Sequence, residues 1–393
     1  MTSKTTKKVY LDYAAATPLS PEVRRAMQPY LTEDYGNPSS LHDLGRSAKE
    51  AVEESRVFVA RALGCRPEEI VFTAGGTEAN NLAILGVLSI KGKAHFITTN
   101  IEHPSVMETA EAFSASGGEV TYIPVESTGL VKPLKIIKAI KRSTLLISVM
   151  YANNEIGTIQ PIQNLARELA KINKDRLKKG WKPVLLHTDA CQAPSYLKMD
   201  VHALGVDLMT INGSKIYGPK QVGALFVSRK IKTILPVIHG GGQEAGLRSG
   251  TENVAGVVGL SKALTLAIKN RTRESARLIK LRDYLTSELV KISGIVVNGD
   301  LENRLPNNVN ISVTGFDGET LIIYLDKQGI MASTGSACSS TKIEASHVIK
   351  ALGLPRAHAL SSIRFSLGRA NTKQDMDVVV SALKKVLKVL GGG

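Results

Sequence analysis

Short apolar runs rich in β-branched residues alternate with amphipathic helical stretches between residues 68 and 228. The strand-like runs are EEIVFTA, AHFITTN, EVTYIPV, TLLISVMYA, PVLLHTD, VDLMTIN and GALFVS. This alternation predicts an α/β fold in which a mostly parallel sheet is sandwiched by helices. Ligands bind such sheets at the carboxyl ends of the strands, so functional residues are sought there.

The pattern changes in the last third of the chain. A helical stretch over 253–289 precedes the strand-like GIVVNG and NNVNISVTG, the helix-like GETLIIYLDKQ and a closing helix over 373–390. These elements predict a smaller α+β domain. A chain of 393 residues is too long for one ordinary core. We therefore expect a large domain and a small C-terminal domain that also includes the N-terminal segment, with the bounds 16–263, 264–393 and 1–15.

The formal net charge of +15 raises the question of nucleic-acid binding. The lysines and arginines are scattered, and their densest run is KINKDRLKKGWK (171–182). A solvated basic helix end followed by a loop explains this run, and an acidic docking partner is the alternative. Aromatic residues make up only 5% of the chain, too few for a base-stacking platform. No direct nucleic-acid binding is expected.

The three cysteines, Cys65, Cys191 and Cys338, form no CxxC pair, which argues against a disulfide framework and a zinc site. The first residues, MTSKTTKKVY, contain no apolar run after the lysines, so a secretory signal is not expected. No apolar stretch approaches the roughly 18–20 residues of a membrane span. A protein of the reducing cytoplasm fits these features best.

Polar residues follow the ends of the predicted strands. Asp189 and Gln192 lie in HTDACQ, and Lys215 lies in TINGSKIYGPK. Gly76 and Thr77 open a helix in GGTEANN, where backbone N–H groups and the helix dipole favour a phosphate. Each feature alone has an ordinary explanation, such as a helix cap or a surface lysine. Together they supply a Schiff-base lysine, a carboxylate for a pyridine nitrogen and a phosphate anchor, as pyridoxal phosphate enzymes require.

The chain resembles the NifS-like cysteine desulfurases, which are fold-type I pyridoxal phosphate enzymes of the class V aminotransferase type. The similarity runs from YLDYAAATPLSP (10–21) and YGNPSSLHDLGR (35–46) to IRFSLGRANT (363–372), nearly the whole chain. The motifs between them are FTAGGTEANN, IEHPSV, YANNEIGTIQP, HTDACQ, GSKIYGPKQVGALFV, GGGQEAGLRSGTEN and STGSACSS. Their order and spacing carry the resemblance, because no single motif is decisive.

The resemblance implies roles for the residues around the cofactor. Lys215 would form the Schiff base, Asp189 would pair with the pyridine nitrogen, and Gln192 would reach the ring hydroxyl. His103 would stack on the ring and move protons. Asn154 would lie near the ring and the substrate carboxylate, and Arg364 would bind that carboxylate bidentately. The cofactor phosphate would be held by Gly76, Thr77, Asn212 and Ser214.

One further implication concerns the subunit interface, and two features depart from the family. Thr251 resembles a residue that reaches the partner subunit's phosphate in the family's homodimer. The family commonly has histidine before the Schiff-base lysine, whereas this chain has Ser214. A hydroxyl can still donate to phosphate, although with a shorter reach. A second departure is the long connection KDRLKKGWKP (174–183), which we interpret as a surface insertion.

Cys338 lies among small and polar residues in STGSACSS, where no neighbouring side chain can build a core. The resemblance implies that its thiolate takes sulfur from the substrate, L-cysteine, and releases L-alanine. The persulfide would pass to acceptor proteins, such as an iron–sulfur scaffold or a tRNA-thiolation enzyme. The chain itself is expected to bind no metal, although Cys338 could contact a cluster on a partner.

Several alternatives remain open from the sequence. The protein could be a selenocysteine lyase or another class V aminotransferase, or a basic scaffold that retains only the fold. His103 could simply cap a helix, and Arg364 could form a structural ion pair. We interpret the remaining candidates as packing or structural residues without a catalytic role. They are Cys65, Cys191, His42 and His187.

Overall fold

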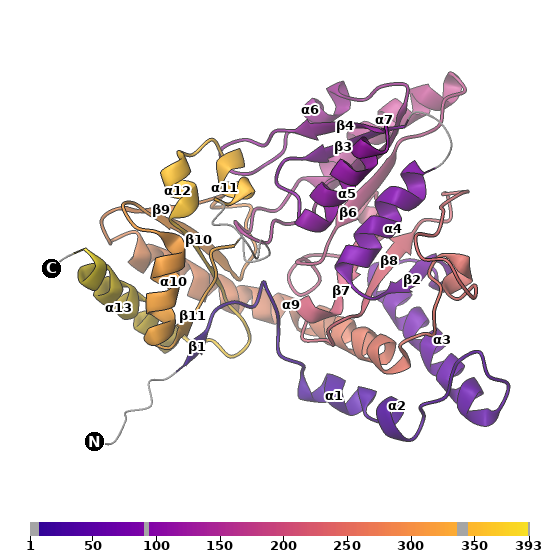
Figure 1. Ribbon diagram of the computed structural model, residues 1–393, viewed down its shortest axis with the longest axis horizontal. Helices are drawn as coiled ribbons and strands as arrows, with labels where there is room; N and C mark the ends of the chain where they lie inside the picture. The colour runs from indigo at the N-terminus through magenta and orange to yellow at the C-terminus, as the bar shows by residue number, and fades with distance from the viewer. Residues whose placement is uncertain (1–7, 90–93, 336–344, 392–393) are drawn as a thin grey trace.

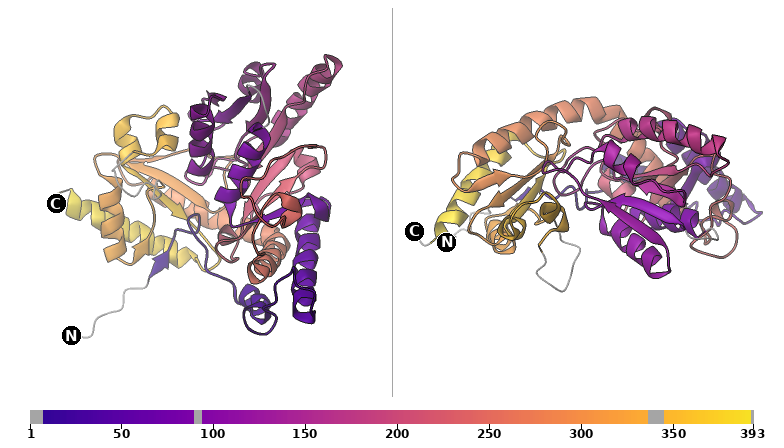
Figure 2. Two further views of the ribbon diagram at one scale, coloured as in Figure 1. Left: turned by 45° about the vertical axis from the view of Figure 1, so that its right-hand side comes forward. Right: turned by 90° about the horizontal axis from the view of Figure 1, so that it is seen from above.

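The computed structural model describes residues 8–89, 94–335 and 345–391. Two lobes are visible in Figure 1. The larger lobe contains a seven-stranded sheet with its helices, and the smaller lobe contains most of the C-terminal third of the chain. The long helix α9 (Val254–Leu289) runs from one lobe to the other, as the right-hand view of Figure 2 shows.

The large sheet is mixed but mostly parallel. β8 pairs antiparallel with both of its neighbours, while the remaining pairs are parallel. This confirms the predicted α/β fold. In spatial order the strands are β2 (Ile70–Thr73), β8 (Gly223–Val227), β7 (Leu208–Asn212), β6 (Leu185–Asp189), β5 (Thr144–Ser148), β3 (His95–Thr99) and β4 (Glu119–Ile123).

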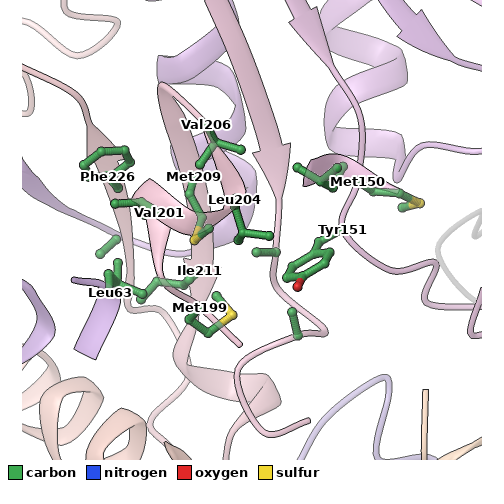
Figure 3. Close-up of a cluster of buried hydrophobic side chains, with 14 of the residues drawn as sticks. Leu63, Met150, Tyr151, Met199, Val201, Leu204, Val206, Met209, Ile211 and Phe226 are labelled. Atoms are coloured by element: carbon green, nitrogen blue, oxygen red, sulfur yellow. The ribbon is translucent and has the colours of Figure 1, made fainter. Parts of the chain in front are cut away.

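Helices pack on both faces of the sheet, and alternate side chains along a strand belong to different cores because they point to opposite sides. Phe96 and Leu146 pack with α4 (Gly76–Leu88) and α5 (Pro104–Ala115) in one core. Their neighbours Ile97 and Ile147 belong to a larger core on the other face, part of which Figure 3 shows. The helices of that larger core include α3 (Asp43–Leu63), α6 (Pro133–Lys138), α7 (Ile162–Lys178), α8 (Val201–Leu204) and the first half of α9.

The small lobe is built on an antiparallel sheet of three strands, β12 (Ser362–Ser366), β10 (Asn308–Val313) and β9 (Ile295–Val297). A two-stranded parallel sheet joins β1 (Val9–Tyr10) to β11 (Ile330–Met331). The predicted closing helix is α13 (Lys373–Leu390). The other α-helices among the described residues are α1 (Pro21–Met27), α2 (Pro29–Thr32), α10 (Gly318–Lys327), α11 (His347–Ala351) and α12 (Arg356–Leu360).

Helix α9 contributes to both main cores. Its residues up to Ala267 pack in the large lobe, and those from Leu278 onward pack with β10 and α13 in the small lobe. Val9 and Leu11 also belong to the small-lobe core, as expected for the N-terminal segment. The predicted domain boundary between residues 263 and 264 falls inside this continuous helix and stays a prediction.

The basic run 171–182 is a helix end followed by a loop. α7 continues to Lys178, so the first half of the predicted insertion is helical. Arg176 is buried and donates to the carbonyl oxygens of Lys141, Thr144 and Lys182, among others. The guanidinium of Arg176 also lies 5.7 Å from the ring centroid of Trp181. One buried arginine therefore fixes the insertion to the start of β5.

Within the described ranges, no helix combines the length and apolar character needed to cross a membrane.

Candidate active site

A cavity of about 310 Å³ lies where several strands of the large sheet end. Asp189 ends β6 and Asn212 ends β7, while His103 lies between β3 and α5. The small lobe contributes Gly335 and Arg364 to the same wall. The cavity therefore lies at the edge where ligands bind α/β sheets and is bounded by both lobes.

Nine of the twelve predicted site residues line this cavity. Ser214 lies next to it and hydrogen-bonds to Asn212, whereas Thr251 is exposed. Cys338 lies outside the described residues. The nine lining residues are Gly76, Thr77, His103, Asn154, Asp189, Gln192, Asn212, Lys215 and Arg364.

The carboxylate of Asp189 is held from two sides. Its Oδ1 accepts a hydrogen bond from the backbone N–H of Cys191 at 2.9 Å, and its Oδ2 accepts from Nδ2 of Asn80 at 2.7 Å. Asp189 is 6% exposed and Asn80 is fully buried. The two donors fix the carboxylate at the strand end with a defined orientation.

His103 has two structural roles in this protein. It is the N-cap of α5, where Nδ1 accepts from the backbone N–H of Ser105 at 3.1 Å, and it also lines the cavity. The predicted alternative of a helix cap is therefore correct, without excluding a role in the site. Burial lowers the pKa of His103. The nearby Asp189 raises this pKa, whereas Lys215 and His347 lower it further.

Lys215 lies in a single helical turn after β7, and the N-terminal segment faces it. Nζ of Lys215 donates to the carbonyl oxygen of Ala15. Nε2 of Gln192 donates to the carbonyl oxygen of Ala14 at 3.0 Å. The first residues of the chain thus form one wall of the cavity and orient two of the predicted site residues.

The start of α4 provides an anion cradle. Gly75 caps the helix without a side-chain hydrogen bond and has φ of +144°, a conformation that favours glycine. A Cβ on Gly76 would lie 2.7 Å from Sγ of Cys191, so a side chain there would clash. Gly76 and Thr77 line the cavity, so the first turn of α4 places its backbone N–H groups and the positive end of the helix dipole beside it.

Arg364 is 3% exposed and is held by groups from two distant segments. Its Nη2 lies 2.7 Å from Oδ1 of Asp12, and its Nη1 donates to the carbonyl oxygen of Asn154 at 3.1 Å. The alternative of an ion pair is thus correct as well. Nε of Arg364 is buried and has no hydrogen-bond partner among the described residues. The cationic guanidinium of a residue that lines the cavity fits the binding of a carboxylate.

The comparisons with known proteins agree with this geometry. The sequence profile of the class-V aminotransferases matches residues 9–379. The chain belongs to the class-V aminotransferase family. It is 48% identical over 388 residues to "Cysteine desulfurase IscS" of Dictyoglomus turgidum, covering 98% of this chain and 95% of that relative. It is 45% identical over 387 residues to a protein of the same name from Clostridium botulinum strain Hall, covering 97% and 95%.

Solved structures give the same result. A "NIFS-LIKE PROTEIN" superposes with a TM-score of 0.89 at 38% identity, covering 98% of this chain and 100% of that one. A NifS-like protein from Rickettsia africae has a TM-score of 0.85 at 31% identity, covering 97% and 100%. The predicted resemblance to the NifS-like cysteine desulfurases and the predicted fold type are confirmed.

Pyridoxal phosphate is the cofactor of this family, and the residues present fit it. The cradle at Gly76 suits the phosphate, and the fixed carboxylate of Asp189 suits a protonated ring nitrogen. Lys215 lies within the same cavity. Among the residues that the structure describes, no group of three or more His, Cys, Asp or Glu side chains could hold a metal ion.

Sequence reasoning missed several residues of the site. Asn80, Ser105, Ala14 and Ala15 line the cavity, and Asp12 holds Arg364. Asn80 carried a usable signal, since it lies four residues after Gly76 and therefore on the same helix face. Asp12 carried no such signal, because nothing in the sequence relates it to a residue 352 positions away.

The other singled-out residues have structural roles. His42 caps α3, and His187 is buried between Ser148 and Thr210, which confirms the structural interpretation of both. Burial raises the pKa of Cys65 to about 12, so its thiol stays protonated at neutral pH. Cys191 is also partly buried, and the pKa of its thiol is raised, first by burial and then by Asp189.

Glu102 gives a testable pH dependence of stability. Its side chain is fully buried, and burial raises its pKa to about 8. As pH rises from about 4.5 to 8, the unfolded chain loses this proton while the folded protein keeps it, so stability falls. Glu102→Gln should remove this fall, with a difference of up to about 4 kcal/mol between pH 5 and pH 8. Urea unfolding at several pH values measures it.

The matched control is Glu108→Gln, which changes an exposed glutamate on α5. This variant should keep the wild-type dependence of stability on pH. Parallel curves for wild type and Glu102→Gln would show that Glu102 is ionised in the folded protein.

Proposed function

We propose that this protein is a cysteine desulfurase that converts L-cysteine to L-alanine and transfers the sulfur, as a persulfide, to Cys338. The observation that carries the proposal is the meeting of Lys215, Asp189 and Arg364 in one cavity of a chain from this family. These residues supply the Schiff-base amine, the partner of the ring nitrogen and the cation for a substrate carboxylate.

The cofactor, when bound, supplies an electron sink for the substrate's α-carbon. The carboxylate of Asp189, which Asn80 and Cys191 orient, would accept a hydrogen bond from the protonated ring nitrogen of the cofactor. Gly76 and Thr77, with Asn212 and Ser214, would hold the phosphate. Gln192, fixed by Ala14, would contact the ring hydroxyl.

Substrate binding would depend on Arg364 and Asn154. The guanidinium of Arg364 would donate hydrogen bonds to the carboxylate of L-cysteine, and its ion pair with Asp12 fixes its orientation before the substrate arrives. Nζ of Lys215, once free of the cofactor, would remove the α-proton of the substrate and return a proton later. Both steps need the small lobe and the sheet edge to share one cavity.

The sulfur transfer would use the thiolate of Cys338. Its Sγ would attack the substrate sulfur, so that a sulfur–sulfur bond forms while the bond between the substrate's Cβ and sulfur breaks. The electron pair of the broken bond passes to carbon, and protonation there leads to alanine. Cys338 lies outside the described residues, but Gly335, three residues earlier, lines the cavity.

The proposal extends to partners and location. A homodimer in which Thr251 reaches the partner subunit's phosphate would complete the site. Acceptor proteins, such as an iron–sulfur scaffold or a tRNA-thiolation enzyme, would receive the persulfide sulfur from Cys338. The cytoplasm is the compartment that we propose, because the thiol must stay reduced to react.

The test is the release of alanine from L-cysteine in the presence of a dithiol reductant. Wild type should form alanine and sulfide in equal amounts, and Cys338→Ala should form neither above background. The matched control is Cys65→Ala, since the Cys65 thiol is outside the cavity lining and should leave the rate unchanged. Mass spectrometry should find one extra sulfur atom on Cys338 before reductant is added.

Two results would contradict the proposal. Full activity of Cys338→Ala on cysteine would exclude the persulfide mechanism. A wild-type protein that ignores cysteine but releases alanine from selenocysteine, or transfers the amino group to a keto acid, would instead be a selenocysteine lyase or an aminotransferase.

A further inference from the structure

A continuous chain of hydrogen bonds links the carboxylate of Asp189 to the ring of His103. Nδ2 of Asn80 lies 2.7 Å from Oδ2 of Asp189 and 2.8 Å from Oγ of Ser105. Oγ of Ser105 lies 2.9 Å from Nδ1 of His103. All four side chains line the cavity, and none was assigned to this chain of bonds from the sequence.

The carboxylate of Asp189 determines which atom is the donor in each of these hydrogen bonds. An ionised carboxylate only accepts hydrogen bonds, so the atom of Asn80 that faces Asp189 must be the amide nitrogen. The second hydrogen of that nitrogen points to Oγ of Ser105, which is therefore an acceptor. The single hydroxyl hydrogen of Ser105 is then left to donate to Nδ1 of His103.

A second donor reaches the same ring nitrogen independently. The backbone N–H of Ser105, which can only donate, lies 3.1 Å from Nδ1 of His103 in the helix cap. A proton on Nδ1 would oppose both hydrogens. Nδ1 is therefore an acceptor, and the proton of the neutral imidazole belongs on Nε2.

We propose that Ser105, oriented by Asn80, fixes His103 as the neutral Nε2–H tautomer, so that His103 offers the cavity a hydrogen-bond donor and not a base. Ser105 and Asn80 are positioning residues in this proposal. The role that it gives His103 in the reaction rests on the proposed function. Proton removal from the substrate then falls to Lys215 alone. A second proton on Nδ1 of His103 would require the hydroxyl to turn and the cap to open.

The electrostatic surroundings of His103 agree with a neutral ring. Burial has the largest effect and lowers the pKa of His103, and the charged groups that also shift this pKa are Asp189, Lys215 and His347. Asp189 favours the imidazolium, whereas Lys215 and His347 oppose it. Asp189 thus acts on His103 in two ways, through its charge and through the hydrogen-bond chain.

The test is nitrogen NMR of the cofactor-loaded protein with ¹⁵N-labelled histidine, with the His103 signals assigned by their absence in His103→Gln. Wild type at neutral pH should show an unprotonated Nδ1 and a protonated Nε2. Ser105→Ala should shift the tautomer ratio about fivefold toward Nδ1–H, since one hydrogen bond of about 1 kcal/mol is lost. It should also raise the midpoint of the His103 titration and move the acidic limb of the pH–rate profile with it.

Two further variants separate positioning from packing. Ser105→Thr keeps the hydroxyl and should restore the wild-type tautomer. Ser116→Ala removes a hydroxyl at the far end of the same helix and should change nothing. A proton on Nδ1 in wild type, or an unchanged tautomer and titration in Ser105→Ala, would overturn the proposal. Because the tautomer is read without turnover, a protein that shows it but releases no alanine would contradict the proposed function alone.

Discussion

Lys215→Ala is expected to lower the rate of alanine release from L-cysteine by about 10³-fold or more. The variant loses both the amine that holds the cofactor and the group that removes the α-proton, and proton transfer by a placed side chain contributes about 10²–10⁴-fold. Nζ of Lys215 lies against the carbonyl oxygen of Ala15 in the cavity wall. The visible absorption of the Schiff base measures the loss of cofactor attachment, and discontinuous assays of alanine measure the loss of rate.

The control for this variant is Lys220→Ala, an exposed lysine five residues further along the chain. It should keep both the absorption band and the rate. If Lys215→Ala kept more than a tenth of the activity, another group would have to remove the proton. His103 would be the first candidate, and the tautomer assignment would then be wrong as well.

The second large effect is expected at Arg364. Arg364→Ala should raise the KM for L-cysteine by about 10²-fold or more, because losing one member of a buried hydrogen-bonded charge pair costs about 2–5 kcal/mol. The variant also leaves Asp12 without its cation at the cavity wall. Arg364→Lys should recover only part of the affinity, since a lysine cannot bind a carboxylate bidentately.

Inhibition by two small molecules shows whether the effect is specific. The inhibition constant for L-alanine should rise in Arg364→Ala, whereas that for L-alaninamide, which has no carboxylate, should stay close to wild type. Arg356→Ala, an exposed arginine of α12, is the matched control and should change neither constant. An equal loss of both inhibitors would mean that Arg364 only supports the fold.

The sequence was informative where local patterns carry the information. The strands and helices of the large lobe, the long helix over 253–289 and the closing helix follow from the periodicity of apolar residues, and the structure has them at nearly the predicted bounds. Asp189, Gln192 and Lys215 were found because functional residues follow strand ends, whereas Asn212 came from the family resemblance. The family resemblance added His103, Asn154 and Arg364, which no local pattern distinguishes from a helix cap or an ion pair.

Contacts between distant segments could not be predicted in this way. The pairing of β1 with β11, the ion pair between Asp12 and Arg364, and the wall formed by Ala14 and Ala15 join residues about 200 to 350 positions apart. Their side chains are ordinary, so only the folded chain shows that they belong to the site. The orientation of Asn80 and Ser105 likewise depends on tertiary neighbours and not on propensity.

The place of the N-terminal segment has a consequence for how the protein matures on the ribosome. Val9 pairs with Ile330, and the carbonyl oxygen of Leu11 accepts from the backbone N–H of Ser366. Residues 9–11 are made long before their partners in β11 and β12 leave the ribosomal tunnel. Such long sequence separations delay native contacts. A growing chain can therefore complete its large sheet early, but it gains a competent cavity only after β12 has been made.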